Sequence, residues 1–421
     1  MLKGFSLFLC LFLWACSGRN APDRAARENS VPGAETRAPE IEAPFSEERP
    51  FSPYLPGADD NSYAMYREEA ARIASFLDGR VLAAQVLMAG MDNKNYLSGE
   101  MKSIFIAVPP GGIMFFKYNL NAEKDKVRSF LTECSELTVS VSGITPFLAA
   151  DHEGGAVHRF GPGVTRLPAA ASFWELAEIE GKDEALAAVE ELSRLSAAEI
   201  RDLGITLNLA PVAEVLSDDN SAFLETRSYG PDPEFTEAAA SAFIRGMDAL
   251  GVACAVKHFP GNSQGDPHDV EVVLDVDRDA LDRIIRPFSG IIRTIRPAAL
   301  IVSHVKVPAL DPLRSSSLSP LVMDWLREDL GFAGIIITDD FSMGAVAASG
   351  IAPGDAAVEA LISGADMVMV WPLDIAVVYE AILKALEENR LPRSRLREAA
   401  EHILAEKLRY GLAVDAAGDI L

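Results

Sequence analysis

Eight short apolar stretches, separated by longer segments of helical character, constrain the fold of this chain more than any other feature. Each is a near-continuous hydrophobic run, which is typical of parallel strands buried on both faces. Eight strand–helix units in succession predict an α/β fold, a (β/α)8 barrel of the TIM type. The strands are expected at Ala84–Gly90, Gly111–Phe116, Pro146–Asp151, Thr206–Pro211, Val252–Val256, Ala298–His304, Gly334–Asp339 and Ala365–Val370.

The segments between the strands carry apolar residues at helical spacing. The longest of them predicts one helical region over Ser172–Leu203. A chain of 421 residues is long enough for such a barrel as a single catalytic domain with additional segments. Other helices are expected at Ala64–Leu77, Ala122–Thr138, Pro233–Leu250, Ile375–Glu388 and Pro392–Tyr410.

Polar side chains stand where the apolar strands end. The active sites of (β/α)8 barrels gather at the carboxyl ends of the strands. Packing alone explains poorly why apolar strands should stop on charged or hydrogen-bonding residues. Three of the six histidines, His258, His268 and His304, also fall at or just beyond strand ends. The polar ends are Asp151, Asn208, Lys257 with His258, Ser303 with His304, and Asp339 with Asp340.

The loop after the fifth strand holds two groups suited to moving a proton. Asp266 lies two residues before His268, as in an acid or base held by an orienting carboxylate. A polar surface turn is the alternative. The histidines of this region could also bind zinc together with Asp266. No HxH or HExxH spacing occurs, and Lys257 places a positive charge beside His258, so no metal is expected.

Three further candidates each allow more than one interpretation. Asp339 could be a nucleophile, a metal ligand or the N-cap of a helix beginning near Met343. Strand alternation directs Asp339 and Asp340 apart, so one can face the barrel mouth while the other caps the helix. Asp151 opens a glycine-rich turn, Glu153–Gly155, that could be ordinary or could approach a ligand closely. Arg227 could clamp a substrate oxygen or pair with one of the many acids.

Charge and cysteine usage argue against two classes of protein. The net charge of −24 argues against a nucleic-acid-binding protein, which needs a basic face to displace counterions. The four cysteines are scattered and form neither a CxxC motif nor the spacing of a disulfide scaffold.

The N-terminus reads as a targeting segment followed by a tether. Lys3 precedes the apolar run Phe5–Trp14, which is too short to span a bilayer and is typical of a secretory signal. The run closes on Cys16 and resembles the lipobox of bacterial lipoproteins, with Trp14 in place of the usual small residue. A plain secretory signal or an uncleaved anchor is the alternative. Residues 17–60, rich in Pro, Ala, Glu and Arg, predict a flexible tether.

We therefore expect a signal peptide over residues 1–16 with Cys16 as the lipidation site, the tether over 17–60, and the barrel over 61–421. This order predicts a protein of the cell envelope, held to a membrane by its N-terminal lipid and facing the periplasm or the exterior.

Several motifs follow one another between Gln85 and Pro372. They are Gly111-Gly-Ile113, Asp151-His-Glu-Gly-Gly155, Asn208-Leu-Ala-Pro-Val212, Arg227-Ser-Tyr229, Lys257-His-Phe-Pro-Gly261, Ser303-His-Val305, Thr338-Asp-Asp-Phe-Ser-Met343 and Gly364-Ala-Asp-Met367. In content and order they resemble glycoside hydrolase family 3, and specifically its single-barrel β-N-acetylglucosaminidase branch.

The resemblance implies a retaining exo-β-N-acetylglucosaminidase that works through a covalent glycosyl-enzyme and needs no cofactor. Asp339 matches the nucleophile of that family. His268 matches the general acid/base, with Asp266 orienting its ring. An imidazole titrates near neutrality, so it can give a proton to the leaving oxygen and take one back from water. The positions that match substrate-binding residues are Asp151, Arg227, Lys257 and His258.

The implied substrate is a saccharide with a terminal β-linked N-acetylglucosamine, derived from peptidoglycan or chitin. Two positions depart from the family pattern. Asn262–Gly265 replaces the usual His-Gly-Asp-Thr in a shorter loop, and Glu214 stands where an Asp is usual. Alternatives are a β-glucosidase or a β-N-acetylglucosaminide phosphorylase of the same family, or a non-catalytic sugar-binding envelope lipoprotein.

Overall fold

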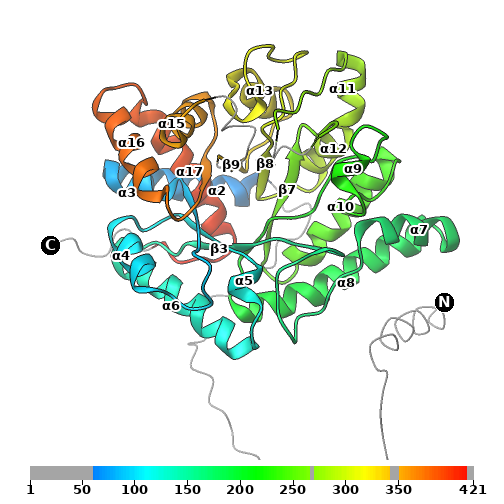
Figure 1. Cartoon of the computed structure of the whole chain (residues 1–421), viewed down its shortest axis with the longest axis horizontal. Helices are drawn as coiled ribbons and strands as arrows, with labels where there is room; N and C mark the ends of the chain where they lie inside the picture. The colour runs from blue at the N-terminus through cyan, green and yellow to red at the C-terminus, as the bar shows by residue number, and fades with distance from the viewer. Residues whose placement is uncertain (1–59, 266–269, 342–349, 415–421) are drawn as a thin grey trace, which may run out of the picture. The chain divides into compact units, whose positions relative to one another are not determined.

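Eight parallel strands close into a barrel in the computed structural model of the chain, which describes residues 60–265, 270–341 and 350–414. Their order around the barrel is β1-β10-β9-β8-β7-β6-β3-β2, and the helices surround them (Figure 1). The predicted (β/α)8 fold is confirmed. The barrel strands are β1 Leu87–Gly90, β2 Gly112–Phe115, β3 Phe147–Ala150, β6 Leu207–Asn208, β7 Ala253–Phe259, β8 Ala299–Val302, β9 Ile335–Asp340 and β10 Met367–Val370.

The first strand begins later than its apolar run predicts. Ala84 and Gln85 belong to a short helix, α3 Gly79–Gln85, rather than to the strand. Asp78 caps this helix, because its carboxylate accepts the backbone N–H groups of Arg80 and Val81. A short apolar run cannot by itself distinguish a buried helix turn from a strand.

The predicted helical region Ser172–Leu203 is two helices, α7 Ala170–Glu180 and α8 Lys182–Leu203. They meet at Gly181, whose φ of 110° lies in the region that L-amino acids rarely adopt. The apolar periodicity continues on both sides of the glycine, so the pattern alone does not reveal the break.

The other helices lie close to their predicted positions. Among the described residues, none is long and apolar enough to cross a membrane. The remaining helices are α2 Asp60–Phe76, α4 Gly99–Ala107, α5 Lys117–Leu120, α6 Lys124–Ser142, α9 Ser221–Leu224, α10 Pro233–Asp248, α11 Arg278–Ile284, α12 Arg286–Thr294, α13 Pro320–Asp324, α15 Pro353–Ser363, α16 Ile375–Glu387 and α17 Arg393–Arg409, with shorter turns η1 Ser316–Leu318 and η2 Trp325–Asp329.

A hairpin follows the third strand where the sequence suggested only a turn. It consists of β4 His152–Gly154 and β5 Val157–His158, paired antiparallel. Gly154 has a φ of 101°, and a Cβ there would lie 2.2 Å from the carbonyl oxygen of Pro168, so only glycine fits. The hairpin directly follows the carboxyl end of β3.

Several predictions lie outside the described residues. They concern the signal segment with Cys16, the tether, the pair Asp266 and His268, and the helix expected near Met343.

Candidate active site

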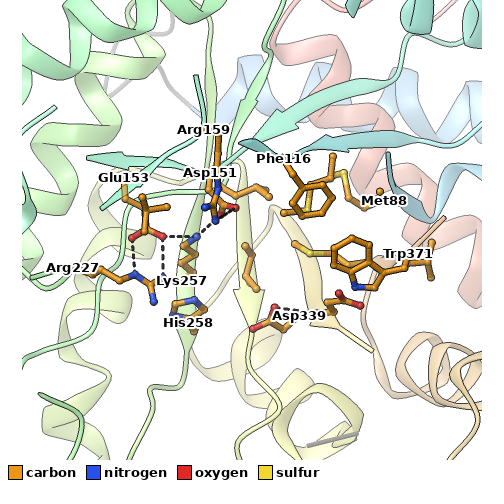
Figure 2. A pocket seen from close by; sticks show the side chains of 18 residues that line it. Met88, Phe116, Asp151, Glu153, Arg159, Arg227, Lys257, His258, Asp339 and Trp371 are labelled. Carbon is orange, nitrogen blue, oxygen red and sulfur yellow. Dashed lines mark hydrogen bonds and ion pairs between the residues drawn. The ribbon is translucent and has the colours of Figure 1, made fainter. Parts of the chain in front are cut away.

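A pocket of about 250 Å³ opens at the carboxyl ends of the barrel strands. Figure 2 shows charged side chains on one side of it, aromatic and methionine side chains on the other, and Asp339 between them in this view. The structure brings five of the predicted site residues to this one pocket, from four different strands or loops. They are Asp151, Arg227, Lys257, His258 and Asp339.

Lys257 is the centre of the charged side. Its side chain is 5% exposed, and its Nζ lies 2.7 Å from Oδ1 of Asp151 and 2.7 Å from Oε1 of Glu153. Arg227 binds the same glutamate through two bonds, from Nε to Oε2 at 2.8 Å and from Nη2 to Oε1 at 2.9 Å. Arg227 therefore pairs with an acid and also lines the pocket.

The mutual pairing keeps these buried groups charged. Burial opposes the ionised form of Glu153, but the positive charges of Lys257 and Arg227 outweigh it and lower the pKa of the carboxyl to about 2. For Lys257, burial likewise opposes the charge, and the carboxylates of Asp151 and Glu153 raise its pKa. The pocket thus presents charged groups that their mutual ion pairs hold in place.

Two members of this cluster are absent from the predicted site. Glu153 follows Asp151 by two residues, and Arg159 donates from Nη2 to Oδ2 of Asp151 at 3.1 Å. Side chains two residues apart along an extended segment share a face, so the spacing of Asp151 and Glu153 was the available signal. Arg159 returns to the pocket through the β4–β5 hairpin, and no local pattern indicates that turn.

His258 is held by a buried carboxylate. Its Nδ1 lies 2.6 Å from Oε1 of Glu214, which is 1% exposed. Asn262 also donates to Glu214, from its backbone N to Oε2 at 2.6 Å and from its Nδ2 to both oxygens at 3.1 Å. Since the carboxylate accepts at Nδ1, the other nitrogen, Nε2, remains for the pocket. The two departures from the family pattern, Glu214 and Asn262, therefore contact each other.

Asp339 is half-buried at the end of β9. Its Oδ1 accepts the backbone N–H of Asp340 at 3.0 Å, and no cationic side chain of the described part pairs with it. A carboxylate at a pocket wall without a cation beside it keeps its lone pairs for an electrophile. Asp340 lines the pocket as well, so strand alternation does not remove it from the mouth.

His304 supports the end of β9 and is not among the residues that line the pocket. Its Nε2 lies 2.9 Å from the carbonyl oxygen of Asp340, and its Nδ1 lies 2.7 Å from Oγ of Ser317. Two members of the alternative zinc set, Asp266 and His268, lie outside the described residues. Within the described ranges, no three His, Cys, Asp or Glu side chains gather as metal ligands.

The other side of the pocket is apolar. Phe116, after β2, and Trp371, after β10, stack with ring centroids 4.8 Å apart and planes inclined by 5°. Met88, Met114 and Met369 line the pocket beside them. A small ligand in this pocket meets hydrogen-bonding groups on one side and an aromatic face on the other.

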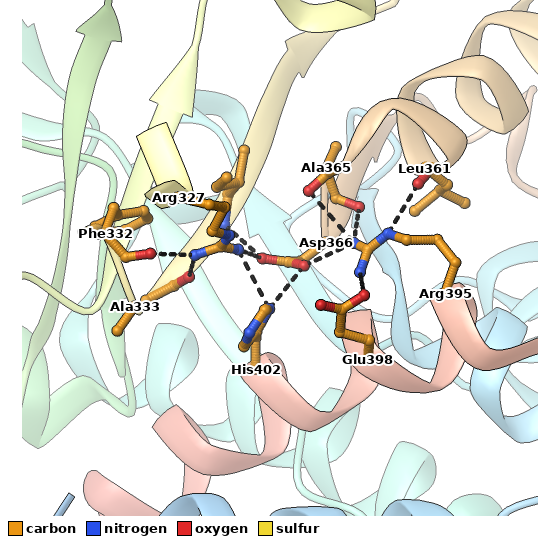
Figure 3. A network of polar contacts seen from close by, with 12 residues as sticks. Arg327, Phe332, Ala333, Leu361, Ala365, Asp366, Arg395, Glu398 and His402 are labelled. Atoms are coloured by element: carbon orange, nitrogen blue, oxygen red, sulfur yellow. Dashed lines mark hydrogen bonds and ion pairs between the residues drawn. The ribbon is translucent and has the colours of Figure 1, made fainter. Parts of the chain in front are cut away.

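A second buried charge network lies at the opposite end of the barrel (Figure 3). Asp366 immediately precedes β10 and is fully buried. Its Oδ1 lies 2.9 Å from both Nη2 of Arg395 and Nδ1 of His402, and its Oδ2 accepts the Ile336 N–H at 2.9 Å and a bond from Arg327. This network joins the starts of β9 and β10 to α17.

The fold and the pocket together define a class of protein. A (β/α)8 barrel with charged side chains, an available carboxylate and an aromatic face in a pocket at its mouth has the arrangement of an enzyme active site. The chain belongs to glycosyl hydrolase family 3, because residues 84–405 match the model of the N-terminal domain of that family. It is therefore a glycoside hydrolase.

Relatives of known name agree with this family. The chain is 35% identical to a protein named Beta-hexosaminidase from Methylococcus capsulatus over 315 residues, which is 72% of this chain and 88% of that protein. It is 32% identical to a Beta-hexosaminidase of Pseudomonas aeruginosa over 313 residues, 71% of this chain and 88% of the relative.

Solved structures share the barrel. A family 3 β-N-acetylglucosaminidase from a Paenibacillus species superposes with a TM-score of 0.74 at 28% identity, over 82% of this chain and 64% of that one. The β-N-acetylhexosaminidase of Beutenbergia cavernae gives a TM-score of 0.70 at 28% identity, over 79% of this chain and 98% of the other.

Proposed function

We propose that this chain is a retaining exo-β-N-acetylglucosaminidase that removes terminal β-linked N-acetylglucosamine from saccharides derived from peptidoglycan or chitin. Two kinds of support exist beyond the family. Relatives that align over most of their length bear the name Beta-hexosaminidase. The Paenibacillus structure with the same barrel is described as a β-N-acetylglucosaminidase.

The observation that carries the proposal is that one pocket of about 250 Å³ is lined both by Asp339 and by the Lys257 cluster, which consists of Asp151, Glu153, Arg159, Arg227 and Lys257. A volume slightly below that of typical ligand pockets suits a single sugar residue rather than a long chain, in keeping with action at a terminus. Asp151, Lys257 and Arg227 offer acceptors and donors for the sugar hydroxyls and so orient the anomeric carbon.

The proposed reaction has two displacements. In the first, a carboxylate oxygen of Asp339 forms a bond to the anomeric carbon while the bond to the aglycone oxygen breaks. His268 gives that oxygen its proton, with Asp266 orienting the ring; both assignments rest on the sequence. In the second, water loses a proton to His268, attacks the same carbon and releases Asp339, which restores the enzyme.

The same proposal places the protein in the cell envelope. The apolar run Phe5–Trp14 and the following Cys16 support a lipid anchor, and the composition of residues 17–60 supports a tether. After detergent phase separation, we expect the unchanged chain in the detergent phase and the Cys16→Ser variant in the aqueous phase. Equal partition of the two proteins would disprove the anchor.

A panel of aryl glycosides, assayed on the full chain in detergent with and without phosphate, tests the activity. We expect hydrolysis of the β-N-acetylglucosaminide, slower hydrolysis of the β-glucoside, and no effect of phosphate. Asp339→Asn serves as the inactive control. Sugar 1-phosphate as the main product would replace the hydrolase by a phosphorylase. Binding of N-acetylglucosamine without turnover of any glycoside would indicate a non-catalytic protein.

A further inference from the structure

We infer that Trp371, backed by Phe116, is the platform on which the terminal sugar ring stacks in the pocket, and that it contributes to the choice of substrate. The inference rests on the proposed function, because it takes the occupant of the pocket to be a saccharide. It assigns a substrate contact to a residue that lies outside the charged cluster.

Trp371 is one end of a row of three stacked rings. Phe116 lies between Trp371, at a centroid distance of 4.8 Å, and Tyr118, at 5.4 Å with planes inclined by 29°. Trp371 and Phe116 line the pocket, whereas Tyr118 does not. Because Phe116 covers one face of the indole, the row supports Trp371 from behind and fixes the orientation of its ring.

The indole is not explained by core packing. Trp371 is half-buried, directly after the last barrel strand, and Leu373 two residues later is 86% exposed. A rigid, half-exposed aromatic ring at a pocket wall is the usual form of a contact surface for a ligand. Met88 and Met369 lie beside it and keep that wall free of charge.

The two sides of the pocket match the two kinds of surface on a pyranose. Hydroxyl groups at the ring edge need donors and acceptors, which the Lys257 cluster supplies. The faces of a ring with equatorial substituents carry axial C–H groups, which are slightly positive and favour the negative face of an aromatic ring. With both sides on one pocket of about 250 Å³, a ring held by the charged side lies within reach of Trp371. The occupant of the platform is therefore the terminal sugar itself and not the leaving group.

Substitutions in the full chain test the platform. Trp371→Ala should raise KM for the aryl β-N-acetylglucosaminide by about tenfold or more, as removal of a stacking ring does for nucleobases, with a smaller change in kcat. Trp371→Phe keeps a flat ring and should recover most of the affinity. Leu373→Ala changes an exposed side chain two residues from Trp371 and outside the pocket, and should leave KM unchanged. An unchanged KM in Trp371→Ala would overturn the inference.

Fluorescence gives a reading that does not depend on turnover. The chain has four tryptophans, so titration of the Asp339→Asn protein with N-acetylglucosamine should change an emission that Trp371→Phe removes. If the wild-type protein hydrolyses the glycoside, but substitution of Trp371 changes neither KM nor the emission response, the platform is disproved and the proposed function stands. If the emission change depends on Trp371 but the wild-type protein hydrolyses no glycoside, the proposed function is disproved and the sugar-binding role of Trp371 stands.

Discussion

The two buried charge networks at opposite ends of the barrel are similar in composition but differ in what they face. At the mouth, Lys257 joins two carboxylates, and the cluster lines a pocket. At the base, Asp366 joins two arginines and His402, and its two oxygens each have two protein partners. Both sets are largely buried, so burial and pairing alone do not identify a functional site.

The difference lies in the unused hydrogen-bonding capacity. The mouth cluster meets open volume, where a ligand can take up the remaining donors and acceptors. The base network spends its capacity on backbone: Arg327 donates to the carbonyls of Phe332 and Gly334, and Arg395 to that of Leu361. We interpret the mouth cluster as a binding site and the base network as a structural link that holds the starts of β9 and β10. Substitutions in each network test this contrast.

Lys257→Met should produce the largest combined effect. It removes the cation that Asp151 and Glu153 share, so the sugar loses its fixed contacts and the two carboxylates repel each other. We expect kcat/KM for the aryl glycoside to fall by on the order of 10³-fold, together with a loss of about 3–5 kcal/mol of folding free energy. Steady-state kinetics and urea unfolding measure the two effects. Full activity in this variant would contradict the role of the cluster.

Asp366→Asn should affect stability alone. The substitution leaves Arg327 and Arg395 buried without their shared carboxylate, which should cost about 3–5 kcal/mol of folding free energy. Burial opposes ionisation of Asp366, but Arg327 and His402 lower its pKa well below the usual range, so the loss should be present at neutral pH. The folded protein should keep the wild-type KM and kcat. A changed KM at unchanged stability would erase the distinction between the two networks.

The predictability of the two networks from the sequence also differs. Part of the mouth could be predicted because Asp151, Lys257 and Asp339 lie at the ends of apolar strands, and the fold brings strand ends together. The base could not, because Asp366 and His402 are separated by 36 residues and Arg327 by 39, with no shared motif. Arg159 and Trp371 could not be predicted because their positions depend on a hairpin and a ring stack, whereas the two-residue spacing from Asp151 was an available signal for Glu153.

Glu214→Gln should have a smaller effect at the mouth. The amide can still contact Asn262, but it binds the His258 ring less strongly than a carboxylate and no longer requires a hydrogen on Nδ1. We expect kcat/KM to fall by about 10- to 100-fold, the equivalent of roughly 1.5–3 kcal/mol for a bond to a charged group. Glu214→Asp, which keeps the charge, is the matched variant and should retain more activity. If the pH profile of kcat/KM changes in Glu214→Gln but not in Glu214→Asp, the effect comes from the orientation of His258 and not from a general loss of structure.

The smallest effect concerns a second buried lysine, Lys407 of α17, whose Nζ donates to Oε1 of Gln85 at 2.8 Å. Burial lowers its pKa to about 7, in contrast to Lys257, whose carboxylate partners raise its pKa. Above pH 7 the unfolded chain holds a proton on Lys407 that the folded chain has lost, so stability should rise with pH until the unfolded lysine also titrates.

The expected slope is at most about 1.4 kcal/mol per pH unit. Urea unfolding between pH 6 and 9 measures it, and Lys407→Met should remove this contribution. The same slope in both proteins would show that Lys407 is charged in the fold.

Mass spectrometry of the full chain after incubation with a fluorinated N-acetylglucosaminyl fluoride tests the mouth site most directly. Such a compound reacts as a substrate but slows the release of a covalent intermediate. We predict a gain of one sugar on the peptide that contains Asp339, and no gain in Asp339→Asn. An adduct on another side chain, or unmodified protein that still turns over the aryl glycoside, would contradict the assignment of Asp339 as the nucleophile.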